Sequence, residues 1–397
     1  MKLSGRIQKV QPSMTLAIDA KARELKARGE DIIGFGAGEP DFPTPENIKE
    51  AGIAAIRQNQ TRYTPAGGTD ALKDAILEKL QSDNRLAYQR NQIVVSNGGK
   101  HSFYNLAQAL WEDGDEVIVP APYWVSFPEM IRLSGASPVI VHTTVESGFK
   151  VSPQQIDRAV TRNTRALVLN SPCNPTGSAY TRPELEALAE TALKHGLLII
   201  SDEIYEKIVF DGFRHHSIAS LDPEVQRNCV VINGVSKAYA MTGWRIGYLA
   251  AEPEIAAAVL KLQGQSTSNP CSISQAAAIE ALRGSQATVE QQVRQFQRRR
   301  DNLLERLENI PGVTCYKPVG TFYTFPDFSG VFGKRYNGGT IDGSLALTDY
   351  LLSEAKVGLV PGIAFGADAH ARISFATSLE TLSEGLDRIA GALARLR

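Results

Sequence analysis

Short apolar runs alternate with longer amphipathic stretches through the middle of the chain. Helical periodicity at Ser102–Leu110 and Pro183–His195 predicts crossover helices, the second with Thr181 as its N-cap and Gly196 as its C-terminal stop. Strands that alternate with helices are typical of an α/β fold with a mostly parallel sheet. Seven runs rich in β-branched residues predict the strands: Gln92–Ser96, Glu116–Pro120, Pro138–Val141, Ala166–Asn170, Leu197–Asp202, Cys229–Asn233 and Ile246–Ala250.

The two ends of the chain follow a different pattern. Ile18–Gly29 and Thr288–Asn309 have the periodicity of long amphipathic helices, and Phe322–Phe325 and Arg372–Ala376 predict short strands. The glycine-rich stretch Tyr336–Ser344 predicts one surface loop. Both ends together predict a smaller α+β domain beside the large α/β domain. The predicted division is 1–45 for an N-terminal segment of the small domain, 46–287 for the large domain and 288–397 for the rest of the small domain.

Composition narrows the classes of protein. Among 397 residues, 42 basic and 43 acidic side chains give a formal net charge of −1, which lacks the clustered positive charge that nucleic-acid binding needs. No stretch reaches the roughly 18 apolar residues of a membrane span, and the first residues lack the apolar core of a secretory signal. Four scattered cysteines without a CxxC pair predict reduced thiols. We therefore expect a cytoplasmic protein without nucleic-acid or membrane partners.

Polar side chains suited to catalysis or ligand binding follow several predicted strands. Asp202 in SDEIY lies at a strand's carboxyl end, where α/β sheets place ligand groups, and the loop NSPCNPTGS holds Asn174. Lys237 lies in a stretch of small, uncharged residues that favours a nucleophilic lysine, and Arg245 eight residues later suits a phosphate. Each feature alone is more typical of a solvated turn or a surface lysine than of a functional site, so the hypothesis depends on their combination.

Two glycine-rich segments argue against nucleotide enzymes. In SNGGKHSFYN, Ser96–Asn105, two glycines join a strand to a helix whose free amides suit a phosphate, but the spacing is not the GxxxxGK[ST] of nucleoside triphosphatases. In GFGAGEP, Gly34–Pro40, the glycines run into a proline and not into a helix. The dinucleotide-binding fingerprint of dehydrogenases is therefore missing.

Six motifs occur together in one order: GEPDF, RYTPAGG, NPTG, SDEIY, SKAYAMTGWRIGY and RISFAT. In order and spacing the chain resembles the fold-type I aminotransferases that depend on pyridoxal 5′-phosphate (PLP), most of all the subgroup Iβ aspartate aminotransferases. The resemblance extends from about Gln11 to the C-terminus. It implies PLP as cofactor, amino acids and 2-oxo acids as substrates, and a homodimer with shared active sites.

The resemblance also implies roles around the cofactor. Lys237 would bind PLP covalently and then move a proton at the substrate's Cα, as nucleophile and general base. Asp202 would pair with the pyridinium nitrogen, and Tyr205 and Asn174 would bond the phenolic oxygen. The remaining implied contacts are Trp124 stacked on the ring; Arg245, Gly98, Gly99, Lys100 and Ser236 at the phosphate; and Tyr63 reaching the phosphate of the other subunit.

Substrate contacts follow from the same resemblance. Arg372 would clamp the α-carboxylate through two parallel hydrogen bonds. The animal-type enzymes bind the distal carboxylate with an arginine that is missing from GQSTSNPCS here. In subgroup Iβ a lysine at the position of Lys100 takes that role, although Lys100 is equally compatible with a phosphate-binding cation alone. The other implied substrate contacts are Ser13, Thr15, Gly38, Trp124 and Asn174.

The leading hypothesis is an aspartate aminotransferase that converts L-aspartate and 2-oxoglutarate to oxaloacetate and L-glutamate. Lys100 and Thr15 accompany prephenate transamination to arogenate in some subgroup members, so this second activity is predicted too. Alternatives with the same cofactor residues are an alanine or aromatic aminotransferase and a PLP-dependent C–S lyase. A non-enzymatic PLP-binding regulator is a further alternative, but such proteins carry a fused DNA-binding domain for which we find no room.

Overall fold

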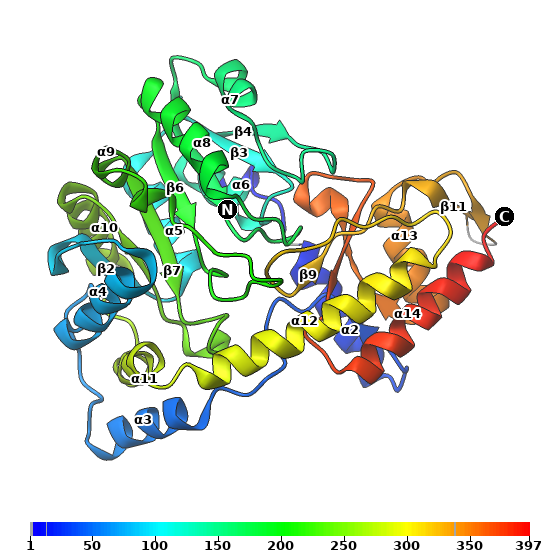
Figure 1. The fold of residues 1–397 in the computed structure, drawn as a ribbon, viewed down its shortest axis with the longest axis horizontal. Helices are drawn as coiled ribbons and strands as arrows, with labels where there is room; N and C mark the ends of the chain where they lie inside the picture. Colours follow the sequence, from blue (N-terminus) through cyan, green and yellow to red (C-terminus); the bar gives the residue numbers. More distant parts are fainter. Residues whose placement is uncertain (1–2, 13, 337–338) are drawn as a thin grey trace.

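A seven-stranded sheet forms the centre of the larger part of the molecule (Figure 1). The protein is represented by a computed structural model that describes residues 3–12, 14–336 and 339–397. All seven predicted strands are confirmed, and β8 alone runs antiparallel to its neighbours β2 and β7. The strands lie in the order β2 (Ile93–Ser96), β8 (Gly247–Ala250), β7 (Cys229–Gly234), β6 (Leu198–Asp202), β5 (Thr164–Asn170), β3 (Glu116–Ala121) and β4 (Ser137–His142).

Helices cover both faces of this sheet because successive strand residues point to opposite sides. Ile118 and Leu167 belong to one buried cluster, whereas their neighbours Val117 and Val168 belong to another. One face is covered by α5 (Gly99–Leu110), α6 (Ser126–Ser134) and α10 (Pro253–Ser266). The other is covered by α3 (Glu46–Arg57), α4 (Asp70–Asn84), α7 (Pro153–Ala159), α8 (Arg182–Lys194), α9 (Pro223–Arg227) and α11 (Ser272–Arg283).

The predicted caps of α8 are confirmed. Thr181 and Glu184 form a reciprocal capping box at its N-terminus, and Gly196 follows its C-terminus with a φ of +64°.

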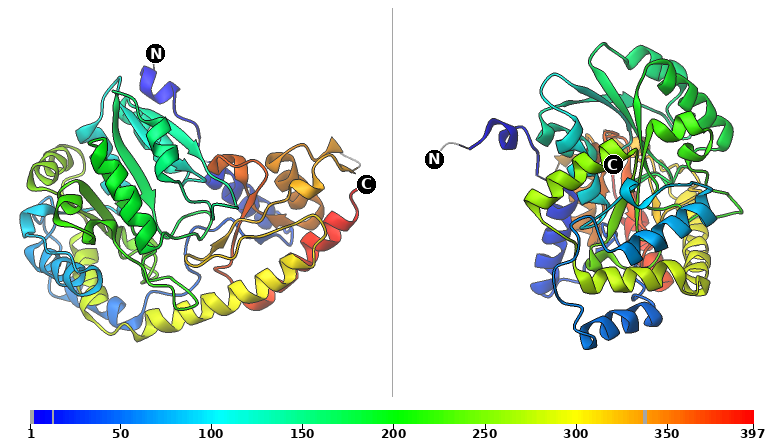
Figure 2. Two further views of the ribbon diagram at one scale, coloured as in Figure 1. Left: turned by 45° about the horizontal axis from the view of Figure 1, so that its top comes forward. Right: turned by 90° about the vertical axis from the view of Figure 1, so that its left-hand side faces the viewer.

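A second core gathers both ends of the chain. Its antiparallel sheet has the order β13 (Val360–Pro361), β14 (Ala371–Ser374), β9 (Tyr323–Thr324). The strand β1 (Ile33–Gly34) pairs in parallel with β12 (Val357–Gly358), which ties the N-terminal region to the C-terminal one. The long α12 (Ala287–Glu308) runs from beside the large sheet to this core, as Figure 2 shows. The other helices are α1 (Gly5–Gln8), α2 (Met14–Ala27), α13 (Ser344–Tyr350) and α14 (Leu379–Ala394). The domain boundaries at 45/46 and 287/288 stay a prediction.

The prediction of one surface loop over Tyr336–Ser344 is wrong. The strands β10 (Arg335–Tyr336) and β11 (Gly339–Thr340) form a short antiparallel pair. The side chains of Ile341 and Ser344 are buried. The glycines of this segment favour turns, but they do not show that Ile341 and Ser344 are buried. In the part of the chain that the structure describes, no helix is long and apolar enough to cross a membrane.

Candidate active site

A cavity of about 320 Å³ lies beyond the carboxyl ends of β5 and β6, between the two cores. This volume falls in the range of small-molecule sites. Most of the residues that the sequence predicted for the site line this one cavity: Gly38, Gly99, Lys100, Trp124, Asn174, Asp202, Tyr205, Ser236, Lys237, Arg245 and Arg372.

Lys237 follows β7, and its side chain enters the cavity. Its Nζ donates a hydrogen bond to the Gly38 carbonyl at 2.6 Å. Burial, together with the positive charges of Arg372 and Arg245, lowers the pKa of Lys237 to about 8. A lysine with this pKa is partly neutral near physiological pH, so its nitrogen has a lone pair for nucleophilic attack or for accepting a proton.

Asp202 is the last residue of β6 and is only 7% exposed. One carboxylate oxygen accepts a hydrogen bond from the Ile204 amide at 3.1 Å. Within residues 3–12, 14–336 and 339–397, no lysine or arginine forms an ion pair with it, and burial raises its pKa to about 7. A buried carboxylate is stabilised by a cation, so this position suits a ligand's protonated nitrogen.

Arg372 on β14 is a buried cation, as Asp202 is a buried acid. It is 3% exposed, and its two terminal nitrogens donate to the Asn174 side-chain oxygen at 3.0 Å and the Gly36 carbonyl at 2.7 Å. Its Nε is buried without a hydrogen-bond partner, and none of the described carboxylates pairs with it. Because an isolated buried charge is costly, this guanidinium suits a ligand carboxylate.

A helix start and an arginine form an anion-binding corner. The helix α5 begins at Gly99, and Gly98 caps it with a φ of +91°. Arg245 donates to the carbonyls of Thr242 at 2.8 Å and Asn97 at 3.0 Å, which holds it beside these glycines. A side chain at Gly98 would clash with the guanidinium, so glycine is needed for this approach. Free helix amides beside an arginine suit a phosphate.

Lys100 occupies the second position of α5. Its Nζ lies 5.2 Å from the centroid of the Trp124 ring, and burial together with nearby Arg245 lowers its pKa. Lys100, Val125 and Arg245 also line an adjoining hollow of about 1020 Å³. The lysine therefore marks the boundary between the cavity and a larger space.

Two predicted residues that the structure describes, Gly98 and Tyr63, do not line the cavity. A Cβ atom at Gly98 would meet the guanidinium of Arg245, which does line it. Tyr63 lies outside it and is 92% exposed. Ser13 lies outside the described residues, and so does the side chain of Thr15.

The most informative residue that the sequence did not reveal is Tyr323. Its hydroxyl lies 3.2 Å from the Tyr205 hydroxyl, and its ring lies under the guanidinium of Arg372 at 4.3 Å. It stands in the apolar stretch predicted as a strand, where a tyrosine gives no sign of a functional role. The other lining residues without a prediction are Gly36, Val125, Asn170, Ile204 and Thr242.

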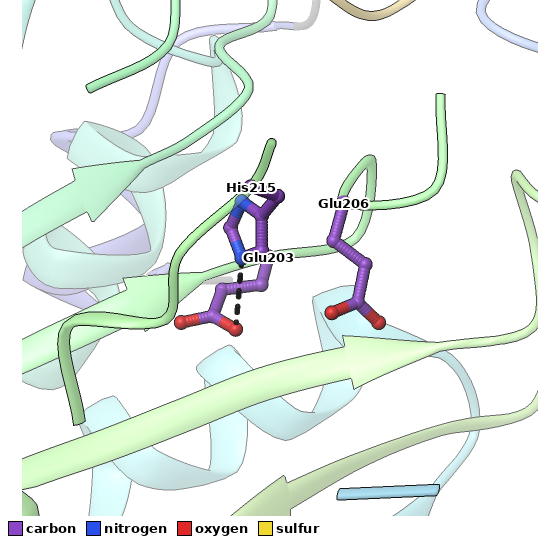
Figure 3. Close-up of side chains that lie close together, drawn as sticks. All are labelled: Glu203, Glu206 and His215. Carbon is purple, nitrogen blue, oxygen red and sulfur yellow. Dashed lines mark hydrogen bonds and ion pairs between the residues drawn. The ribbon is translucent and has the colours of Figure 1, made fainter. Parts of the chain in front are cut away.

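Glu203, Glu206 and His215 form a separate cluster of potential metal ligands (Figure 3), with ligand atoms within 4.8 Å of one another. His215 Nε2 lies 3.3 Å from Glu203, and Glu206 forms a buried ion pair with Lys79. The Lys79 and His215 charges, with hydrogen bonds, lower the pKa of Glu206 to about 2. Lys79 already supplies the cation that this acid needs. Side-chain amides also donate to Glu206 from Asn84 and Asn233.

A profile of the family described as "Aminotransferase class I and II" matches residues 30–389. The chain belongs to this family. It is 49% identical to the aspartate aminotransferase of Geobacillus stearothermophilus over 98% of both chains. It is 47% identical to a probable aspartate/prephenate aminotransferase of Rickettsia bellii, covering 98% of this chain and 99% of the relative.

A solved structure of the aspartate aminotransferase from Rhizobium meliloti matches this aminotransferase with a TM-score of 0.97 and 43% identity over 100% of both chains. The enzymes of this family depend on PLP. The cavity fits this cofactor, because PLP has a ring nitrogen that pairs with a buried acid and a phosphate that suits a helix start with an arginine. The buried Asp202 without a cation and the corner of α5 with Arg245 meet both requirements.

Proposed function

We propose that this aminotransferase converts L-aspartate and 2-oxoglutarate to oxaloacetate and L-glutamate. The observation that carries the proposal is the pair of cations Arg372 and Lys100, which line the same cavity as Lys237 without a carboxylate partner among the described residues. Two cations suit the two carboxylates of aspartate and glutamate. The aspartate aminotransferases of Geobacillus stearothermophilus and Rhizobium meliloti, similar over nearly the whole chain, support this substrate class.

The cofactor-binding roles belong to the same proposal. Lys237 would bind PLP covalently, Asp202 would pair with its ring nitrogen, and Trp124 would stack on its ring. Bound PLP would supply an electron sink for the pair released at the substrate's Cα. The phenolic oxygen would be bonded by Tyr205 and Asn174, and the phosphate by Arg245, Ser236 and the amides of Gly99 and Lys100. The Gly98 amide, also predicted at the phosphate, already donates to the Ser96 carbonyl at 2.7 Å.

The protein's own residues then orient the substrate and move its proton. Arg372 binds the α-carboxylate through its free donor edge, and the Gly38 main chain adds a contact. Lys237 Nζ takes the proton from Cα, a role that its pKa of about 8 suits because the neutral amine is populated near pH 7 to 8.

The side-chain part of the proposal is tested with Lys100→Ala. We expect kcat/KM for aspartate to fall by about 10- to 100-fold, because one charge-assisted contact is lost, while kcat/KM for alanine changes by less than about threefold. The control is Lys150→Ala, which removes a lysine paired with Glu184 outside the cavity. An unchanged aspartate value would show that Lys100 does not read the distal carboxylate.

A second substrate is proposed from the adjoining hollow of about 1020 Å³, which gives a larger dicarboxylate room beyond Lys100. The relative from Rickettsia bellii, a probable aspartate/prephenate aminotransferase, agrees with such a substrate. We propose that the enzyme also converts prephenate to arogenate with aspartate or glutamate as donor. Incubation of the holoenzyme with prephenate and aspartate should yield arogenate by chromatography, and a lack of product would reject this activity.

A homodimer is also part of the proposal. Tyr63 is too exposed in one subunit to be a core residue, and we propose that it reaches the phosphate in the other subunit. Sedimentation should give a dimer. Mixed dimers of Tyr63→Ala and Lys237→Ala subunits should contain one intact site and recover part of the activity; two impaired sites would contradict the shared arrangement.

The four free cysteines support the proposed cytoplasmic location, which cell fractionation tests.

A further inference from the structure

Tyr323 is the common neighbour of two site residues that come from distant parts of the chain. It lies on β9, fully buried. Its hydroxyl is 3.2 Å from the hydroxyl of Tyr205, which follows β6 in the large sheet. Its ring centroid is 4.3 Å from the guanidinium carbon of Arg372 on β14. One side chain therefore contacts the cofactor side and the carboxylate side of the cavity.

The ring contact leaves the donor edges of Arg372 available. A guanidinium that stacks on an aromatic face is held through its plane, whereas its N–H groups point outward along the edges. Two of these edges reach Asn174 and Gly36, and Nε stays without a partner. The Tyr323 ring at 4.3 Å, with the more distant Phe365 ring at 5.2 Å, thus holds the plane of the guanidinium without competing for the hydrogen bonds that a carboxylate needs.

The hydroxyl contact acts on Tyr205. Either hydroxyl can donate in this pair. When Tyr205 donates its proton to a ligand oxygen, its own oxygen is free to accept from Tyr323. A hydroxyl that accepts a hydrogen bond becomes a stronger donor, because successive bonds polarise one another. Tyr323 therefore strengthens the bond that Tyr205 makes to the phenolic oxygen of bound PLP.

We propose that Tyr323 is a positioning residue with two separable roles: its ring orients Arg372 for the substrate's α-carboxylate, and its hydroxyl tunes the cofactor through Tyr205. The inference rests on the proposed function. If Tyr323 only filled the core, Tyr323→Phe would have little effect. Phenylalanine would keep the packing against Phe322, whose ring centroid lies 4.6 Å away.

The hydroxyl role is tested with the Tyr323→Phe holoenzyme by following its visible absorbance as a function of pH. A weaker hydrogen bond to the phenolic oxygen stabilises the deprotonated cofactor less, so the midpoint should rise by roughly 0.3 to 1 pH unit. In a Tyr205→Phe background the same substitution should cause no further shift, because its route of action is gone. An unchanged midpoint in Tyr323→Phe, or an equal shift in both backgrounds, would overturn this role.

The ring role is tested by calorimetric binding of succinate, an unreactive dicarboxylate, to the holoenzyme. Tyr323→Phe keeps the aromatic face, so its Kd should stay within about twofold of the wild type, whereas Tyr323→Met keeps much of the volume without the face and should bind about tenfold more weakly. Equal affinities of the Phe and Met variants would overturn it. If the Met variant does not fold, Tyr323→Leu replaces it.

Tyr350→Phe is the matched control, because it removes a buried phenol that donates to the Ala392 carbonyl outside the cavity. It should change neither the absorbance midpoint nor the succinate affinity, and a shift as large as that of Tyr323→Phe would overturn the proposal. A wild-type protein that develops no visible band with PLP would instead reject the proposed function, so the two failures are distinguishable.

Discussion

Two sets of charged side chains in this aminotransferase differ in their partners. Beneath the site, Lys79 and Glu206 form an ion pair, and the fully buried Arg300 contacts Asp211 and Asp301 at 2.8 and 2.6 Å. Around the cavity, none of the described residues forms an ion pair with the acid or with any of the four cations. These unpaired groups are Asp202, Lys100, Lys237, Arg245 and Arg372.

The difference separates charges that hold the fold from charges that await a ligand. A buried ion is tolerated when the protein supplies its counter-ion and hydrogen bonds, and it costs several kcal/mol otherwise. The paired set links the helices α4 and α12 to the turns that hold Glu206 and Asp211. The unpaired set lines the cavity, so we expect cofactor and substrate to supply its counter-ions. Substitutions in the two sets should therefore have different consequences.

The largest effect is expected for Lys237→Ala. Loss of the nucleophile and base should lower kcat by at least ~10⁴-fold and abolish the pH-sensitive visible band of the holoenzyme. Stopped assays and absorbance spectra measure both. Lys207→Ala, which removes a lysine paired with Asp83 outside the cavity, should keep the band. A band that survives in Lys237→Ala would show that another residue binds PLP.

Glu206→Gln tests the paired set. It leaves the Lys79 ammonium buried without a counter-ion, so the free energy of unfolding should fall by about 3–5 kcal/mol. Urea denaturation of the holoenzyme measures this loss. The double variant Lys79→Met/Glu206→Gln removes both charges and should recover most of it. Additive losses in the double variant would contradict the pairing as the cause.

Arg372→Met tests the unpaired set at the α-carboxylate. We expect kcat/KM for aspartate to fall by about 10²- to 10³-fold, because a buried carboxylate would lose its charged donors. The free energy of unfolding of the cofactor-free protein should not fall as it does in Glu206→Gln, since no counter-ion is stranded. Arg306→Met, which breaks a surface pair with Asp387, should leave kinetics unchanged.

The last effect concerns the pH dependence of stability without cofactor, and it reaches its full size only above pH 7. The pKa of Asp202 is raised from 3.8 to about 7, so between these values the folded chain holds a proton that the unfolded chain has lost. Stability from this group is therefore lost as pH rises from about 4 to 7. Asp202→Asn removes the loss, so its advantage in unfolding free energy over the wild type should grow by up to ~4 kcal/mol from pH 4 to pH 8. A pH-independent difference would contradict the raised pKa.

The sequence singles out Asp202 and Lys237 because each lies at or just beyond the end of an apolar run, and the sheet brings the ends of such runs together. Their roles and the other site residues were predicted from the six motifs that carry the family resemblance. Tyr323 could not be found this way, because its hydroxyl is functional only through Tyr205 and its ring only through Arg372. The Lys79–Glu206 pair escaped notice for a similar reason, since its members belong to separate elements with no shared motif.

The sequence by itself determined the seven strands, the crossover helices with their caps and the family motifs, since hydrophobic period and turn chemistry are local properties. Only the tertiary structure decided which buried charges have a partner. Glu206 meets Lys79 from α4 and Asn233 from β7, whereas Arg372 meets carbonyls and an aromatic ring. Pairing depends on distances between residues far apart in the chain, and in this protein those distances separate the charges that stabilise the fold from the charges that bind a ligand.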